Sequence, residues 1–216
     1  MVADAADGYE DVMGRQIPES MDRRGFFRKA LRKTGETVVQ HADAQARRRA
    51  AHWIRPPFAL DELEFLLACT RCSDCFEACT YQVVFPLPAR LGAQVAGTPA
   101  MDLLNRSCHL CEDWPCVSAC EHHALKLPET SDNDPPSLPS MALAWIDTDR
   151  CLPYSGPECG ACASSCPVPG ALEWEMEKPR INQMACTGCA LCREACIVEP
   201  KAISVKSMND NVDSPT

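Results

Sequence analysis

Sixteen cysteines in four groups of four constrain this chain more than any other feature of its sequence. In chain order the groups are Cys69, Cys72, Cys75 and Cys79; Cys108, Cys111, Cys116 and Cys120; Cys151, Cys159, Cys162 and Cys166; and Cys186, Cys189, Cys192 and Cys196. The first and fourth groups read C-x2-C-x2-C-x3-C, the second C-x2-C-x4-C-x3-C and the third C-x7-C-x2-C-x3-C. With only 6% aromatic residues, the chain is expected to rely on more than apolar packing to hold its fold.

The repeated spacing is typical of cysteines that bind iron–sulfur clusters. A C-x2-C-x2-C loop can wrap around one 4Fe-4S cluster and present three thiolates to its irons. The fourth cysteine is expected on a following helix, and in two-cluster ferredoxins it binds the other cluster of the pair. The four groups therefore predict four 4Fe-4S clusters in two pairs, with all sixteen cysteines as ligands.

Three other uses of cysteine fit the pattern less well. Structural zinc sites use pairs of C-x2-C knuckles separated by a longer loop, without a third and fourth cysteine at these short spacings. Disulfides suit an oxidising compartment, and cysteines packed this closely would strain the bridge geometry. Free structural thiols have no reason to repeat so regularly.

Short β-prone segments flank the cysteine groups and predict the fold class. They lie at residues 124–127, 145–147, 171–175, 180–182 and 202–205. Each repeat can be read as a cysteine loop, a short helix and a strand, with a leading strand before the last two groups. We therefore predict a loop-rich α+β fold of two bacterial two-cluster ferredoxin-like folds, built from βαβ cysteine-loop repeats.

Charge divides the chain into segments. Residues 1–22 carry a local charge of -5 and are expected to be a disordered acidic start, whereas residues 23–56 carry +8 and predict a basic helical arm. Residues 57–216 carry -12, with the four-motif body expected at 57–206 and a flexible tail at 207–216.

Several function classes are excluded by what the sequence lacks. No apolar run approaches the roughly 18 to 20 residues of a membrane-spanning helix. The net charge of -9 argues against nucleic-acid binding. Neither a G-x-G-x-x-G nor a Walker loop is present. No catalytic base, nucleophile or substrate pocket can be identified, so we expect no enzyme activity.

The basic arm resembles a twin-arginine export signal at one point. Arg23 and Arg24 are followed by Phe26 and Phe27, as in that consensus. An export signal also needs an apolar stretch of about 7 to 15 residues, but charged residues interrupt 28–36. We therefore expect a cytoplasmic protein.

The residues before the first group carry a resemblance to a known family. The segment Ile54–Phe58 (I-R-P-P-F), the pairs Asp61-Glu62 and Phe65-Leu66, and Cys69–Cys72 (C-T-R-C) resemble the opening of NapF, the accessory ferredoxin of periplasmic nitrate reductase systems. The spacing of the second group is instead similar to the four-cluster electron-transfer subunits of molybdenum oxidoreductases. Related NapG and methylamine-utilisation MauM types are also possible, and those usually carry a working export signal.

The resemblance to the four-cluster subunits implies a nested pairing. The first and fourth groups would then share one ferredoxin fold, and the second and third groups the other. Cys69, Cys72, Cys75 and Cys196 would hold one cluster, and Cys79 with Cys186, Cys189 and Cys192 the next. Sequential pairing of neighbouring groups is the alternative.

Two functions follow from these expectations. In the first, the clusters carry electrons between a redox donor protein and the catalytic subunit of a molybdenum-dependent reductase of the nitrate reductase type. In the second, which the NapF resemblance implies, the protein is a maturation factor that assists cofactor assembly of the reductase before export. Both functions use the same cysteines.

Overall fold

A computed structural model describes residues 23–129 and 138–209, with side chains from residue 36 onward. The predicted acidic start, residues 1–22, and residues 210–216 of the predicted tail lie outside the described residues. The elements are α1 (Arg23–Ala50), α2 (Glu62–Ala68), α3 (Asp74–Glu77), β1 (Val84–Pro86), the 3-10 helix η1 (Ala89–Leu91), β2 (Pro99–Met101), α4 (Pro115–Ser118), β3 (Ala142–Ile146), α5 (Leu152–Ser155), β4 (Leu172–Glu175), β5 (Lys178–Ile181), α6 (Leu191–Ala195) and β6 (Ile203–Ser207).

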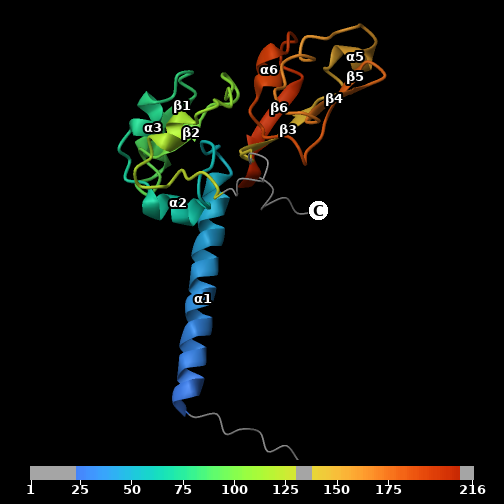
Figure 1. Ribbon diagram of the computed structural model, residues 1–216. Coiled ribbons are helices and arrows are strands. Elements are labelled where there is room, and N and C mark those ends of the chain that lie inside the picture. The colour runs from blue at the N-terminus through green and yellow to red at the C-terminus, as the bar shows by residue number, and fades with distance from the viewer. Residues whose placement is uncertain (1–22, 130–137, 210–216) are drawn as a thin grey trace, which may run out of the picture. The chain divides into compact units, whose positions relative to one another are not determined.

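Of the helical arm expected at residues 23–56, residues 23–50 form the long helix α1, and residues 51–56 lie outside it (Figure 1). The chain divides into one unit up to Gln40 and a second from His41 onward. The last turns of α1 therefore belong to the second unit, and the body begins before the boundary that the charge pattern suggested at residue 57. None of the helices in the described residues is both long enough and apolar enough to cross a membrane.

The end of α1 is fixed within the second unit by polar contacts. Arg47 Nε donates to Asp43 Oδ2 at 2.9 Å, and Arg47 Nη2 lies 3.2 Å from Asp61 Oδ2. Arg49 donates to the side chain of Gln94, and Ala50 is fully buried. Two of the arginines that end the helix thus bind the body of the protein.

The first half of the body, residues 51–129, contains the first two cysteine groups. Strands β1 and β2 pair antiparallel between the two groups, from Val84 opposite Met101 to Pro86 opposite Pro99. An outer pair of hydrogen bonds encloses both groups: Leu60 N–H donates to Ala124 O at 3.0 Å, and Lys126 N–H to Phe58 O at 2.9 Å. The strand predicted at 124–127 is reduced to this isolated bridge.

The second half, residues 138–209, repeats this arrangement with longer strands. Strand β3 precedes the third group and pairs antiparallel with β6, which follows the fourth group, from Ala142 opposite Ser207 to Ile146 opposite Ile203 (Figure 1). Between the groups, β4 and β5 form a hairpin. Its turn residues Met176 and Glu177 have φ values of 47° and 64°, as tight hairpins require. Four of the five predicted strands are confirmed here, and Ser207, expected in the tail, is the last residue of β6.

One apolar core includes residues of both halves. It contains Val117 and Leu125 from the first half and Ala142 and Val205 from the second. Phe65 of α2 is fully buried in it, beneath the guanidinium of Arg55 at 4.4 Å. Because several cysteines also line this core, the binding loops rest on packed side chains.

Candidate iron–sulfur sites

The cysteine loops share a local backbone conformation that turns them tightly. The residue before the second cysteine of the first, second and fourth groups has positive φ: Arg71 (62°), Leu110 (48°) and Gly188 (73°). The next cysteine then lies in a short helix, with Cys75 in α3, Cys116 in α4 and Cys192 in α6. The predicted helix position of the fourth cysteine is therefore wrong, because the helix carries the third cysteine of each of these groups and ends before the fourth.

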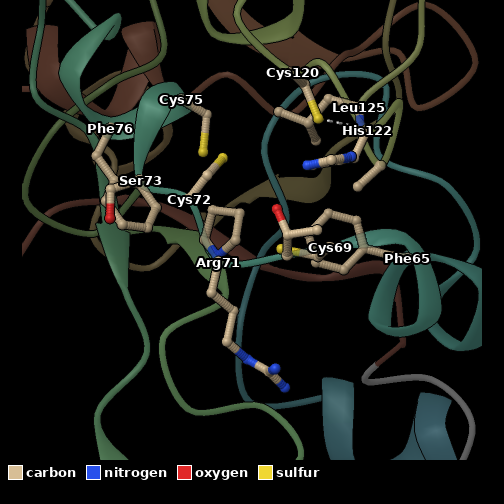
Figure 2. A pocket seen from close by; sticks show the side chains of 13 residues that line it. Phe65, Cys69, Arg71, Cys72, Ser73, Cys75, Phe76, Cys120, His122 and Leu125 are labelled. Atoms are coloured by element: carbon tan, nitrogen blue, oxygen red, sulfur yellow. Dashed lines mark hydrogen bonds between the residues drawn. The ribbon is translucent and has the colours of Figure 1, made fainter.

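Site I contains three cysteines of the first group and one of the second. Figure 2 shows Cys69, Cys72, Cys75 and Cys120 with their sulfurs facing a common space, while the Arg71 side chain points away. The cavity occupies about 370 Å³, including its open mouth. Leu125 N–H donates to Cys120 Sγ at 3.4 Å and so orients that sulfur.

Site II is the reciprocal set in the first half. Cys108, Cys111 and Cys116 line a small cavity together with Cys79 of the first group. The ring of His109 stacks on Tyr81 at the edge of this cavity, with centroids 3.6 Å apart and planes inclined by 6°. The fourth cysteines of the two groups have thus exchanged places, as the ferredoxin spacing predicts.

Sites III and IV repeat this exchange in the second half. At site III, Cys151, Cys159 and Cys162 line a small cavity with Cys196 of the fourth group. At site IV, Cys166 of the third group lies near Cys186, Cys189 and Cys192, where its negative charge would act on all three thiols. Gly188 N–H donates to Cys186 Sγ at 3.4 Å in that loop.

The nested pairing differs from this arrangement. Cys69, Cys72 and Cys75 lie with Cys120 instead of Cys196, and Cys79 lies with the second group instead of Cys186, Cys189 and Cys192. The physical reason is strand pairing. Because β3 lies between the second and third groups in the chain and pairs with β6, the third and fourth groups are enclosed together. The sequential alternative is the one that the structure has.

Burial makes the thiols of these sites hard to ionise. It raises the pKa of Cys75 to about 12, and the neighbouring sulfurs of Cys69 and Cys120 add to the shift. Burial likewise raises the pKa values of Cys108 and Cys192 to about 12, and those of Cys116 and Cys162 to about 11. Four thiolates so close together need a compensating positive charge, which bound iron would supply.

The donor set and its surroundings fit a polynuclear cluster. In the described parts of the chain, no three His, Cys, Asp or Glu side chains are placed to bind a single metal ion; the sulfurs surround cavities instead. Within the part of the chain that the structure describes, two buried donors near the sites have no hydrogen-bond partner: Trp174 Nε1 and Thr187 Oγ1. Trp174 lines site III, and Thr187 lies between Cys186 and Cys189 of site IV. Cluster and thiolate sulfurs are acceptors for such donors.

Comparison with known proteins supports this chemistry. The family described as a 4Fe-4S dicluster domain matches residues 143–197, which contain the third and fourth groups. The ferredoxin-type protein NapG of Escherichia coli (strain K12) is 32% identical over 210 residues, covering 89% of each chain. The chain belongs to this family of ferredoxin-type iron–sulfur proteins.

Two further relatives refine the assignment within the family. The methylamine utilization ferredoxin-type protein MauM of Paracoccus denitrificans (strain Pd 1222) is 34% identical over 193 residues, covering 84% of this chain and 78% of that protein. The ferredoxin-type protein NapF of Escherichia coli (strain K12) is 32% identical but covers 70% of this chain. The chain is therefore more similar to the NapG and MauM types than to NapF. The segments I-R-P-P-F and C-T-R-C had instead suggested NapF. No solved structure matches the chain.

The sequence reasoning missed the polar residues that support the sites. Arg55 and Glu62 pair beside site I, and Ser107 and Glu194 pair between sites II and IV. The first pair lies within the I-R-P-P and D-E motifs, so the motif was a signal for it. Ser107 and Glu194 are 87 residues apart in the chain, and no local sequence pattern indicates that they pair.

Proposed function

We propose that the chain is an electron-transfer protein in which each of sites I to IV binds one 4Fe-4S cluster. The main support is that all sixteen cysteines lie in four sets of four. In each set, three cysteines come from one group and the fourth comes from the neighbouring group. The two halves would then be two-cluster ferredoxin-like folds in sequence.

The residues around the sites favour electron transfer over catalysis. When bound, such clusters accept and release single electrons. The cavities are lined mainly by cysteines and apolar side chains, with His122 and Arg71 among the residues at site I and His109 at site II, so the cluster itself would be the main reactive feature. We infer a role without an enzymatic reaction of its own, in line with the ferredoxin-type names of the relatives.

The partners that we propose are a redox donor protein and a molybdenum-dependent reductase of the nitrate reductase type. The negative net charge of the chain favours basic docking surfaces on these partners. The names of the MauM relatives add methylamine utilization as a second setting for the same electron-transfer role.

We further propose a cytoplasmic location. The arginine pair at the start of α1 is followed by Arg28, Lys29, Arg32 and Lys33 in place of an apolar stretch. Fractionation of cells that produce the chain tests this. We expect the protein with a cytoplasmic marker, and its recovery from the periplasm would contradict this location without touching the cluster chemistry.

An anaerobic redox titration followed by electron paramagnetic resonance tests the function. Electron transfer predicts signals that appear and vanish reversibly at potentials within the range of roughly -700 to +450 mV found for protein clusters. Clusters that decay on cycling, together with loss of active reductase when the chain is absent, would instead support the maturation role.

A further inference from the structure

The binding loops of sites II and IV contact each other directly. Cys108 N–H donates to Cys189 O at 2.9 Å. Both residues are buried, with 7% of their surface exposed, and both belong to the core that the halves share. One hydrogen bond thus joins a cysteine of site II to a cysteine of site IV through the backbone.

Side chains on either side reinforce this contact. Glu194 Oε2 accepts from Ser107 N–H at 3.0 Å and also from Ser107 Oγ. Ser107 is 1% exposed, so its buried N–H and hydroxyl need this carboxylate, and the hydroxyl also lies 3.4 Å from His109 Nε2. Arg193 Nε donates to Leu104 O at 3.1 Å. We call these contacts between residues 104–108 and 189–194 the junction.

The sites within each half are neighbours as well. Helix α3, which carries Cys75 of site I, packs directly against α4, which carries Cys116 of site II. Cys192 of site IV and Cys162 of site III share a buried cluster of side chains, packed against Trp174. The contacts therefore connect the four sites in the order I, II, IV, III, and the junction is the middle link.

We propose that the junction is the contact through which electrons pass between the two halves, and that Ser107 and Glu194 are positioning residues that keep it closed. This inference rests on the proposed function, since it requires clusters at sites II and IV. One electron leaves one site and enters the other. No bond breaks, and no proton has to move.

Variants at Glu194 test the proposal in the full chain. A background with Cys69→Ala and Cys151→Ala removes one ligand each from sites I and III, so that electron paramagnetic resonance reports on sites II and IV alone. With the junction intact, we expect the two reduced clusters to interact magnetically and broaden each other's signals. Glu194→Ala should abolish this interaction, whereas Glu194→Gln, which keeps an acceptor oxygen, should retain it. Glu175→Ala, which removes an exposed ion pair with Arg180, is the matched control.

The possible outcomes separate this proposal from the proposed function. If the background protein binds no iron at sites II and IV, the function itself is wrong. If Glu194→Ala keeps its iron and the magnetic interaction is unchanged, the junction proposal is overturned. Should Glu194→Ala fail to fold, Ser107→Ala removes the hydroxyl contacts with Glu194 and His109, keeps the backbone N–H bond to Glu194, and must weaken the interaction. Hydrogen exchange at the Cys108 amide, faster in Glu194→Ala than in the control, gives a readout that does not depend on electron transfer.

Discussion

Arg55 and Glu62 form a two-pronged ion pair beside site I. Arg55 Nε donates to Glu62 Oε2 at 2.9 Å, and Nη2 donates to Oε1. Their side chains are only 10% and 2% exposed. Arg55 Nη1 also donates to Thr98 Oγ1 at 2.9 Å and to Pro99 O at 2.7 Å. This network explains why the I-R-P-P motif precedes the first group: it ties the chain before α2 to β2, on which site I rests.

Breaking this pair should destabilise the first half. Glu62→Ala leaves the buried guanidinium without its counter-charge, which typically costs about 3–5 kcal/mol. Urea unfolding of the cluster-loaded protein measures this cost. Glu129→Ala is the control because its pair with Lys126 is exposed, and we expect less than about 1 kcal/mol there. Equal costs for the two variants would show that the Arg55 network does not support the fold.

Pairs of cysteine substitutions test which groups share a cluster. Cys69 and Cys120 belong to the same site, so Cys69→Ala and Cys120→Ala should each remove one cluster, and the double variant should remove no more than one. Combining Cys69→Ala with Cys196→Ala should remove two clusters, about eight irons per chain. Iron analysis after anaerobic reconstitution distinguishes these cases. The nested pairing predicts the reverse result for the two double variants.

The raised thiol pKa values predict how pH acts on the metal-free protein. Burial raises the pKa of Cys75, Cys108 and Cys192 from 9.0 to about 12. An unfolded chain therefore loses these protons at lower pH than the folded one, so folded stability is full below pH 9 and falls as the pH rises toward 12. The urea midpoint of the metal-free protein should be lower at about pH 10 than at about pH 8. In the loaded protein the thiols are already deprotonated by binding iron, so its urea midpoint should not fall in this pH range. A urea midpoint of the metal-free protein that rises with pH would contradict the burial of the thiols.

Gly188 allows the loop of site IV to approach β3. A Cβ at this position would lie 2.1 Å from Ala142 O, and the residue has φ +73°. Gly188→Ala should displace the loop and remove the site IV cluster. Gly92→Ala is the control, since Gly92 also has positive φ (+104°), but no atom of the described residues lies within 4 Å of its Cβ position. The control should cost only the backbone strain, about 1–3 kcal/mol for its φ of 104° and ψ of 150°, and keep all its iron. Full iron content in Gly188→Ala would show that the loop tolerates a shift.

The sequence predicted that paired groups exchange their fourth cysteines, but it did not predict which groups form a pair. The C-x3-C spacing predicted that the fourth cysteine binds with the partner group, and Cys79 and Cys120 are exchanged in this way, although each lies after the short helix and not on it. The choice between nested and sequential pairing depends on which strands meet. The pairing of β3 with β6 joins residues about sixty positions apart, and the local pattern carries no information on it.

The polar contacts between the halves illustrate the same limit. Ser107 and Glu194 are ordinary polar residues in the sequence, and only the folded chain shows that the buried serine depends on that carboxylate. By contrast, the strand at 171–175 and its partner at 180–182 could be predicted, because a tight turn and β-prone residues specify a hairpin locally.

The iron and sulfide content of the anaerobically reconstituted full chain, measured together with its Mössbauer spectrum, tests whether sites I to IV each bind one 4Fe-4S cluster. Four 4Fe-4S clusters predict about sixteen irons and about sixteen sulfides per chain, all in tetranuclear clusters. A chain that binds two clusters or fewer, or that takes up zinc in place of iron, would contradict the account.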